Sequence, residues 1–207
     1  MLLSENQIGK LLQPFEIKLT SDEITQLLVY LDLLLRWNAK INLTSIRTPE
    51  ECVTRHFGES LLLGRYYQLE GTLLDIGSGA GFPALALKLV FPKLQICLLE
   101  PVAKKRAFLK EVTRACEFTG VDVRRERVED LIGGLKYDSI TMRAVGIGLV
   151  KASLHHLKLT GKAFFWLSKG QISELTELGP ELSLRIAQSI EIPGSRERII
   201  LPCALEG

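Results

Sequence analysis

Three glycines, Gly77, Gly79 and Gly81, alternate within the stretch from Thr72 to Pro83, which reads TLLDIGSGAGFP. The apolar run before them is typical of a buried strand that ends at a glycine turn. Glycine permits a positive φ and lets a ligand come closer to the backbone than a Cβ would allow. The residues after the last glycine have helical spacing, and Pro83 suits a first helical turn. A strand, a glycine turn and a helix in this order predict a ligand site.

Two acidic residues stand where such a ligand would meet them. Asp75 lies two residues before the first glycine, and Glu100 ends the next predicted strand, LQICLLE. The loop is G-x-G-x-G, and Phe82 takes the place of the third glycine of the dinucleotide fingerprint. A carboxylate at Asp75 would repel a pyrophosphate but suits an ammonium group, and Glu100 can accept both hydroxyls of a ribose. Ammonium, ribose and no phosphate together predict S-adenosylmethionine as the cofactor.

This arrangement resembles the class I S-adenosylmethionine-dependent methyltransferase pattern. The pattern would place Val128 and Glu129, which follow the third predicted strand, against the adenine ring of the cofactor. Pro101 and Val102 would line the same ring from the side of the preceding acid. Arg143 ends the fourth predicted strand, within ITMRAVG. The resemblance therefore predicts a cofactor site along the carboxyl ends of the first four strands.

No catalytic residue is assigned beyond the candidate Arg143. The Asn/Asp-Pro-Pro-aromatic motif usual in exocyclic-amine methyltransferases is absent there, and the only Pro-Cys pair ends at Cys203, in the last predicted strand. Guanine N7 carries a free lone pair in the neutral base. Its attack on a sulfonium methyl requires alignment rather than a strong base. The lack of a catalytic motif fits such an acceptor, although a small-molecule acceptor could also lack one.

The composition is that of a globular protein and argues against a membrane span or a metal site. The 207 residues are 46% hydrophobic and 24% charged, which is ordinary for a soluble domain. No stretch approaches the roughly 18 apolar residues of a membrane span, and the N-terminus does not resemble a secretory signal. The four cysteines are far apart and form no CxxC pair. We therefore expect a cytoplasmic protein with reduced thiols, no bound metal and no membrane partner.

Basic residues concentrate in the window 104–127, which holds eight Lys/Arg and four Asp/Glu. A local basic patch is typical of a protein that binds nucleic acid, although a solvated helix face has the same composition. Contacts to phosphates position a protein on RNA rather than specify a sequence. Five residues of this window are predicted to follow the RNA backbone: Arg106, Lys110 and Arg114, spaced four apart on a helix, with Arg124 and Arg125.

Strands and helices alternate from Thr72 onward, which predicts an α/β protein with a Rossmann-like, mostly parallel sheet. The predicted strands are 72–76, 94–99, 121–123, 137–142 and 163–168. The predicted helices are 83–90, 104–117, 147–157 and 171–178. Two further strand-like runs, 187–192 and 198–205, predict a C-terminal antiparallel hairpin at one edge of the sheet. His155 and His156 are expected on the surface at a helix end, without a role.

Residues 1–70 are predicted to be helical. Thr20 and Glu23 form a capping box before a long amphipathic helix that fades at Asn38. A second capping box at Thr48 begins another helix, which Gly58 weakens by about 1 kcal/mol relative to alanine. No low-complexity linker follows. We therefore expect an N-terminal helical extension, residues 1–70, that packs on a methyltransferase domain, residues 71–207, as one structural unit.

Six motifs resemble those of the bacterial 16S rRNA guanine-N7 methyltransferase G family, also called glucose-inhibited division protein B. They are WNAKINLTSIR (Trp37–Arg47), RHFGESL (Arg55–Leu61), LLDIGSGAGFPALAL (Leu73–Leu87), RVE (Arg127–Glu129), RAV (Arg143–Val145) and SKG (Ser168–Gly170). The resemblance implies methyl transfer from S-adenosylmethionine to N7 of one guanine, with S-adenosylhomocysteine as the product. It also implies 16S rRNA as the partner, either free or within the small ribosomal subunit or its precursor. We expect the protein to be a monomer.

The resemblance also assigns site residues. By position, Gly77, Phe82, Val128, Glu129 and Arg143 correspond to the cofactor contacts of the family. The motifs around the crevice add three candidates for RNA contact: Arg55, His56 and Lys169. For His56, a packed histidine within an amphipathic helix is the alternative.

The chain departs from the family pattern at a few positions. The family usually has Leu-Asp where this chain has Gly58-Glu59, and a serine where Met142 stands. The C-terminus lacks the basic tail of many members. Two alternatives stay open, a small-molecule methyltransferase and a non-catalytic RNA-binding protein with the same fold. The intact glycine loop with Asp75 and Glu100 argues against the second, and the N-terminal motifs argue against the first.

Overall fold

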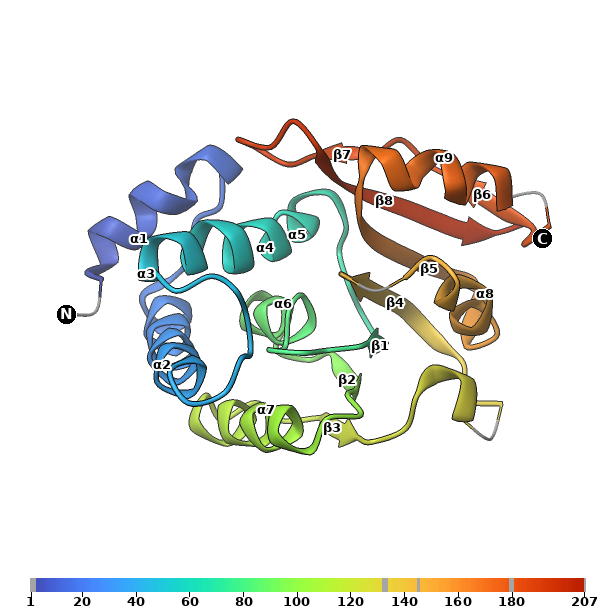
Figure 1. Ribbon diagram of the computed structural model, residues 1–207. Coiled ribbons are helices and arrows are strands. Elements are labelled where there is room, and N and C mark those ends of the chain that lie inside the picture. The colour runs from blue at the N-terminus through green and yellow to red at the C-terminus, as the bar shows by residue number, and fades with distance from the viewer. Residues whose placement is uncertain (1–2, 132–133, 145, 179–180, 207) are drawn as a thin grey trace.

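The computed structural model describes residues 3–131, 134–144, 146–178 and 181–206 (Figure 1). Val145 of the RAV motif therefore lies outside the described residues. The described strands form one sheet in the order β3-β2-β1-β4-β5-β8-β6, and β7 pairs with β8. Their bounds are β1 Thr72–Ile76, β2 Gln95–Leu99, β3 Val121–Arg124, β4 Tyr137–Arg143, β5 Leu157–Ser168, β6 Leu184–Ile186, β7 Ile190–Glu191 and β8 Arg198–Leu205.

Strands β1 to β5 are parallel, and β8 runs antiparallel to β5. The strand order reverses at β1, because the chain turns back from β3 to place β4 on the other side of β1. Ligands of such sheets bind outside the carboxyl ends of the strands at this switch point. The sheet thus positions the glycine loop, which follows β1, at the place where a ligand is expected.

Both faces of the sheet are covered, as the apolar strands require. Alternate residues of β1 point to opposite faces: Leu73 packs in one core cluster and Leu74 in the other. Figure 1 shows the N-terminal helices on the side of α6 (Ala84–Val90) and α7 (Ala103–Ala115), and α8 (Leu149–Leu154) and α9 (Lys169–Leu178) on the opposite side. The predicted Rossmann-like α/β architecture is confirmed.

Short helical segments and one long helix make up the described N-terminal part of the chain. They are α1 Glu5–Leu12, η1 Gln13–Phe15, α2 Ser21–Asn38, α3 Pro49–Glu51, η2 Cys52–Gly58, α4 Glu59–Leu61 and α5 Leu63–Tyr66. The capping box of α2 is complete, because Thr20 accepts from the Glu23 amide and the Glu23 carboxylate accepts from the Thr20 amide. No described helix is long and apolar enough to cross a membrane.

The second predicted helix differs from its expected form. Its cap at Thr48 accepts from the Glu51 amide, but the Glu51 carboxylate accepts from the Thr48 hydroxyl rather than from the amide. The segment η2 is a π-helix, with more residues per turn than the spacing predicts. The ring of Phe15 lies over Gly58 in this segment, where a Cβ would be 2.7 Å from the ring.

The C-terminal third corrects several predictions. The helix expected over 147–157 ends at Leu154, and β5 begins at Leu157, well before the expected strand. The expected hairpin does exist between β7 and β8, but β8 lies inside the sheet between β5 and the short strands β6 and β7. His156 is buried instead of exposed. Its backbone N–H donates to the Ser153 carbonyl, and its backbone carbonyl accepts from the backbone N–H of Tyr137 at the start of β4.

Candidate active site

The glycine loop follows β1 at the carboxyl edge of the sheet. Gly77, Gly79 and Gly81 have φ of 69°, 56° and 87°, the left-handed region that glycine adopts without strain. A Cβ at Gly81 would collide with the hydroxyl of Tyr30 in α2 and the side chain of Leu85, whereas at Gly79 the nearest atom would be 3.7 Å away. Gly81 is therefore needed for packing, whereas a Cβ at Gly79 would make only an ordinary van der Waals contact.

Four N–H groups of the loop already have acceptors within the protein. Gly77 and Ser78 donate to the Leu99 carbonyl at 2.9 and 3.0 Å, and Gly81 donates to the Ser78 carbonyl. The Gly79 amide donates to Glu100 Oε2 at 2.8 Å. Among the described hydrogen bonds, the carbonyl oxygens of Gly77 and Gly79 accept none. The loop therefore offers carbonyl oxygens to a ligand more readily than N–H groups, and these suit an ammonium donor.

Asp75 lies beneath this loop and is fully buried. Its Oδ1 accepts from the Thr141 hydroxyl at 2.6 Å, while its Oδ2 is buried without a partner. Burial raises the pKa of Asp75 from 3.8 to about 6, against the hydrogen bonds from Thr141 and Ser78, which lower it. An orphaned carboxylate oxygen is costly in the interior. Asp75 is not among the residues that line the crevice beside the loop, so its contact with a ligand that brings a hydrogen-bond donor or a positive charge stays a prediction.

Glu100 follows β2 directly and links two segments at the edge of the sheet. Its Oε2 accepts from Gly79, and its Oε1 accepts from the Val102 amide at 2.8 Å. Each carboxylate oxygen keeps one further lone pair for a donor such as a ribose hydroxyl. Pro101 and Val102 are exposed beside it.

The remaining adenine candidates lie after β3. Val128 and Glu129 belong to the short helix η3, Val128–Asp130, in which the valine is buried and the glutamate exposed. Neither is among the residues that line the crevice described next. Their contact with an adenine ring stays a prediction.

A crevice of about 530 Å³ lies between the glycine loop and the N-terminal helices. It brings together residues predicted for the cofactor with residues predicted for RNA. Those that line it include Gly77, Gly79, Phe82 and Arg143 from the first group and Arg55 and His56 from the second. Its charged lining residues are Arg55, Lys105, Arg143, Arg198 and a single carboxylate, Glu59. The crevice is therefore positive overall and large enough for a small ligand.

An aromatic stack joins α2, the glycine loop and η2. The ring of Phe82 stacks on Tyr30 at 5.1 Å and on His56 at 4.7 Å, with interplanar angles of 5° and 15°. His56 Nε2 lies 2.9 Å from Thr44 Oγ1. Burial, together with the charges of Arg143 and Arg55, lowers the pKa of His56 to about 3. His56 is therefore neutral at physiological pH and would contact RNA by stacking or hydrogen bonding, not as a cation.

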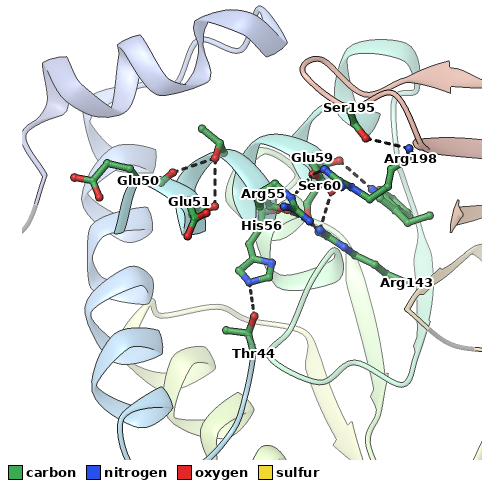
Figure 2. Close-up of polar contacts among 12 residues, drawn as sticks. Thr44, Glu50, Glu51, Arg55, His56, Glu59, Ser60, Arg143, Ser195 and Arg198 are labelled. Carbon is green, nitrogen blue, oxygen red and sulfur yellow. Dashed lines mark hydrogen bonds and ion pairs between the residues drawn. The ribbon is translucent and has the colours of Figure 1, made fainter. Parts of the chain in front are cut away.

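Glu59 and Arg198 are site residues that were not predicted from the sequence. The Glu59 side chain is only 2% exposed, and three arginines surround it (Figure 2). Arg55 Nε and an Arg198 terminal nitrogen lie 3.0 and 2.8 Å from Oε1, and an Arg143 terminal nitrogen lies 2.8 Å from Oε2. The Trp166 indole donates to the Glu59 carbonyl at 3.0 Å. The available signal was the departure at Gly58-Glu59 from the family's Leu-Asp.

The three residues of the predicted basic stripe all lie on α7. Arg106 donates to the carbonyls of Glu100 and Pro101, so it fixes the turn after β2. Lys110 and Arg114 lie farther along α7, up to about 12 Å away at 1.5 Å per residue. They line a separate groove beside β3.

The other predicted RNA contacts belong to two segments, the end of β3 and the start of α9. Arg124 lies 3.5 Å from Asp122 and 4.0 Å from Glu126, while Arg125 is exposed. Lys169, at the start of α9, lies 3.6 Å from Glu191. Contact with RNA by these residues stays a prediction.

The described residues include no group of three or more His, Cys, Asp or Glu side chains that could hold a metal ion. The four cysteines are buried and unbridged. Burial raises the pKa of Cys203 to about 12, so its thiol is not activated as a nucleophile.

The sheet order, the glycine loop and the acid after β2 define a methyltransferase of the Rossmann-like class. Solved structures of that class share the fold. A ribosomal protein L11 methylase from Lactobacillus delbrueckii aligns with a TM-score of 0.63 at 16% identity over 74% of this chain and 79% of its own. The glycopeptide N-methyltransferase MtfA in complex with S-adenosyl-L-methionine aligns with a TM-score of 0.61 at 8% identity, over 73% of this chain and 88% of its own.

Sequence comparison narrows the class to a family. The family model for rRNA small subunit methyltransferase G matches residues 23–198. Ribosomal RNA small subunit methyltransferase G of Xylella fastidiosa is 37% identical over 183 residues, which cover 86% of each chain. The proteins of the same name from Chloroflexus aggregans and Pseudomonas aeruginosa are 36% and 32% identical, over 89% and 90% of this chain and 83% and 90% of theirs.

The chain belongs to the rRNA small subunit methyltransferase G family. Membership of this family confirms the predictions of an S-adenosylmethionine-dependent methyltransferase and of small-subunit rRNA as its substrate.

Proposed function

We propose that the protein methylates N7 of a single guanine in 16S rRNA. The observation that carries this proposal is the lack of an available base in the crevice. Glu59 is the only carboxylate among the described lining residues, and three arginines occupy it. His56 has a pKa of about 3, too low for an effective base at neutral pH. The acceptor atom must therefore have a lone pair that is available without deprotonation, as guanine N7 does.

In this function, the cofactor would bind the glycine loop and its neighbours. S-adenosylmethionine, when bound, supplies an electrophilic methyl group. The Gly77 and Gly79 carbonyls and the orphaned Asp75 oxygen would hold its ammonium group, and Glu100 would hold its ribose. The other predicted contacts are Gly81, Phe82, Pro101, Val102, Val128, Glu129 and Arg143. These residues orient the two reactants, which is what an in-line displacement requires.

The proposal places the acceptor on the positive side of the same crevice. A net positive lining attracts the phosphates of RNA and increases local substrate concentration. The protein would act as a monomer in the bacterial cytoplasm, on rRNA that is free or within the small subunit or its precursor. The helical part, residues 1–70, and the methyltransferase part, residues 71–207, would act as one unit, because both contribute to the crevice.

Labelled methyl transfer tests the proposal. The substrates are naked 16S rRNA, assembled small subunits, and total RNA from cells that lack the protein, with the labelled nucleoside identified after digestion. We expect label in N7-methylguanosine on at least one of the three substrates. Label in a different nucleoside would contradict the N7 assignment. In a further reaction with a small-molecule extract of cells that lack the protein, label in that extract and in none of the RNAs would point to the small-molecule alternative. The absence of any transfer would favour a non-catalytic RNA-binding protein.

A further inference from the structure

The cluster around Glu59 carries more positive charge than its one carboxylate can balance. Three guanidinium groups contact the two carboxylate oxygens, and no other acid is found among the described residues that line the crevice. The Arg143 side chain is 15% exposed, whereas those of Arg55 and Arg198 are 43% and 36% exposed. The unbalanced charge therefore meets solvent mainly through Arg55 and Arg198.

These two arginines also keep donors that no described group accepts. Arg55 donates to Glu59 through Nε alone, so its two terminal nitrogens are free. Arg198 donates through one terminal nitrogen, and its Nε is buried without a partner. Arg143 differs, because it donates to Glu59, to the Ser60 hydroxyl and to the Arg55 carbonyl.

The two guanidinium groups also converge. Arg55 Nε and an Arg198 terminal nitrogen lie 3.0 and 2.8 Å from the same oxygen, Glu59 Oε1. The distance between these two nitrogens therefore cannot exceed the sum of those two distances. Figure 2 shows them reaching Glu59 from different elements, Arg55 from η2 and Arg198 from the start of β8. The backbone of Arg198 is fixed as well, since its N–H donates to Ser195 Oγ at 3.0 Å. Two fixed arginine forks with free donors match the geometry of a phosphate.

We infer that Arg55 and Arg198 form a phosphate-binding subsite for a phosphodiester of the acceptor RNA, and that Glu59 is the positioning residue that holds both. The inference rests on the proposed function. A base that reacts in a pocket must be drawn away from its neighbours. A clamp on the adjacent phosphate at the rim of the crevice would hold the strand while the base enters.

Salt dependence tests the subsite directly. Arg55→Gln and Arg198→Gln should each raise the KM for 16S rRNA, or for the small subunit, on the order of tenfold. Each should also reduce the slope of log Kd against log salt concentration by about one. The matched control is Arg65→Gln, since Arg65 pairs with Glu16 at 2.7 Å, is 38% exposed and does not line the crevice. The control should change neither quantity.

Variants of Glu59 distinguish its role in positioning the arginines from the contribution of the arginines' positive charge. Glu59→Gln keeps all three arginines but loosens their hold, so the KM for RNA should rise while the salt slope does not fall. Glu59→Asp keeps the carboxylate and should recover most of the affinity. If Arg198→Gln does not fold, Arg198→Lys keeps the charge without the fork. It should retain the salt slope and still raise the KM.

Two results would overturn the subsite. One is an unchanged KM and salt slope in both folded arginine variants. The other is a loss of affinity for S-adenosylmethionine in calorimetry with RNA binding intact, which would assign the cluster to the cofactor's carboxylate. Failure of the proposed function can be distinguished from failure of the phosphate subsite, because binding of 16S rRNA and its salt slope can be measured even if no methyl group is transferred.

Discussion

Burial brings the pKa of Asp75 close to neutral pH. With a folded-state pKa of about 6, it loses most of its charge between pH 7 and pH 5. A cofactor ammonium would bind the ionised form, and an α-amino group stays protonated throughout this range. We therefore expect the affinity for S-adenosylmethionine to fall about tenfold from pH 7 to pH 5. Calorimetric titration at several pH values measures this.

Asp75→Asn is the control for that prediction. It should bind the cofactor more weakly and with a flat pH profile. The same substitution should weaken cofactor binding but stabilise the fold above pH 6. A raised pKa means that Asp75 stabilises the fold below pH 3.8 and loses that contribution as the pH rises through about 6. The variant should thus melt at a higher temperature than the unsubstituted protein at pH 8. A steep pH profile in the variant would contradict the role of Asp75.

Gly79→Val tests the loop without disturbing the core. A Cβ there would make only an ordinary van der Waals contact, so a side chain can be accommodated, but the φ of 56° is strained for a β-branched residue. We expect a soluble, folded protein that has lost measurable binding of S-adenosylmethionine in calorimetry. Undiminished affinity would show that the loop does not hold the cofactor.

Among the individual site residues, those whose place is set by a nearby strand or turn could be predicted from the sequence. The loop glycines, Asp75 and Glu100 were predictable because a short strand and turn fix their places. The role of Glu59 was not, since an acid in an amphipathic helix is usually exposed. Its partners Arg143 and Arg198 are 84 and 139 residues away, and only the tertiary structure brings them together.

At the scale of elements, η2 shows packing overriding helix propensity. Gly58 would be expected to weaken its helix, yet a Cβ there would lie 2.7 Å from the buried Phe15 ring. Gly58→Ala should therefore lower the free energy of unfolding by about 1–3 kcal/mol, despite the better propensity of alanine. Chemical denaturation measures the difference.

Gly9 in α1 provides the matched control. It lies in a helix, and no atom comes within 4 Å of the place that a Cβ would take, so Gly9→Ala should raise the free energy of unfolding by about 0.5–1 kcal/mol. A stabilising effect of both substitutions would contradict the packing account of Gly58.

The elements were predicted to different degrees. The bounds of the parallel strands β1 to β4 were predicted to within one residue at each end, because buried strands are continuous apolar runs bounded by turn residues. The π-helical turns of η2 were not predictable, because they depend on contacts with α1 and the sheet. Strand β6, which lies just before the predicted run 187–192, was missed for a similar reason, since β6 and β7 are both defined by pairing with β8.

At the scale of the whole molecule, hydrogen bonds tie the helical part to the methyltransferase part. The Trp37 indole donates to Glu111 at 3.0 Å, and the Trp166 indole donates to the Glu59 carbonyl. We expect a single cooperative unfolding transition in denaturant, with tryptophan fluorescence and far-ultraviolet circular dichroism changing together. A fluorescence transition at clearly lower denaturant would mean that the two parts separate before they unfold.

The most direct measurement of the central claim replaces the acceptor atom itself. 16S rRNA transcribed with 7-deazaguanosine has a C–H group where guanine has N7, so it lacks the lone pair that the proposed reaction requires. In labelled transfer from S-adenosylmethionine, with small-subunit proteins added where assembly is needed, we expect ordinary rRNA to yield N7-methylguanosine and the 7-deaza rRNA to take up no label. Equal labelling of the two RNAs would contradict methylation at N7.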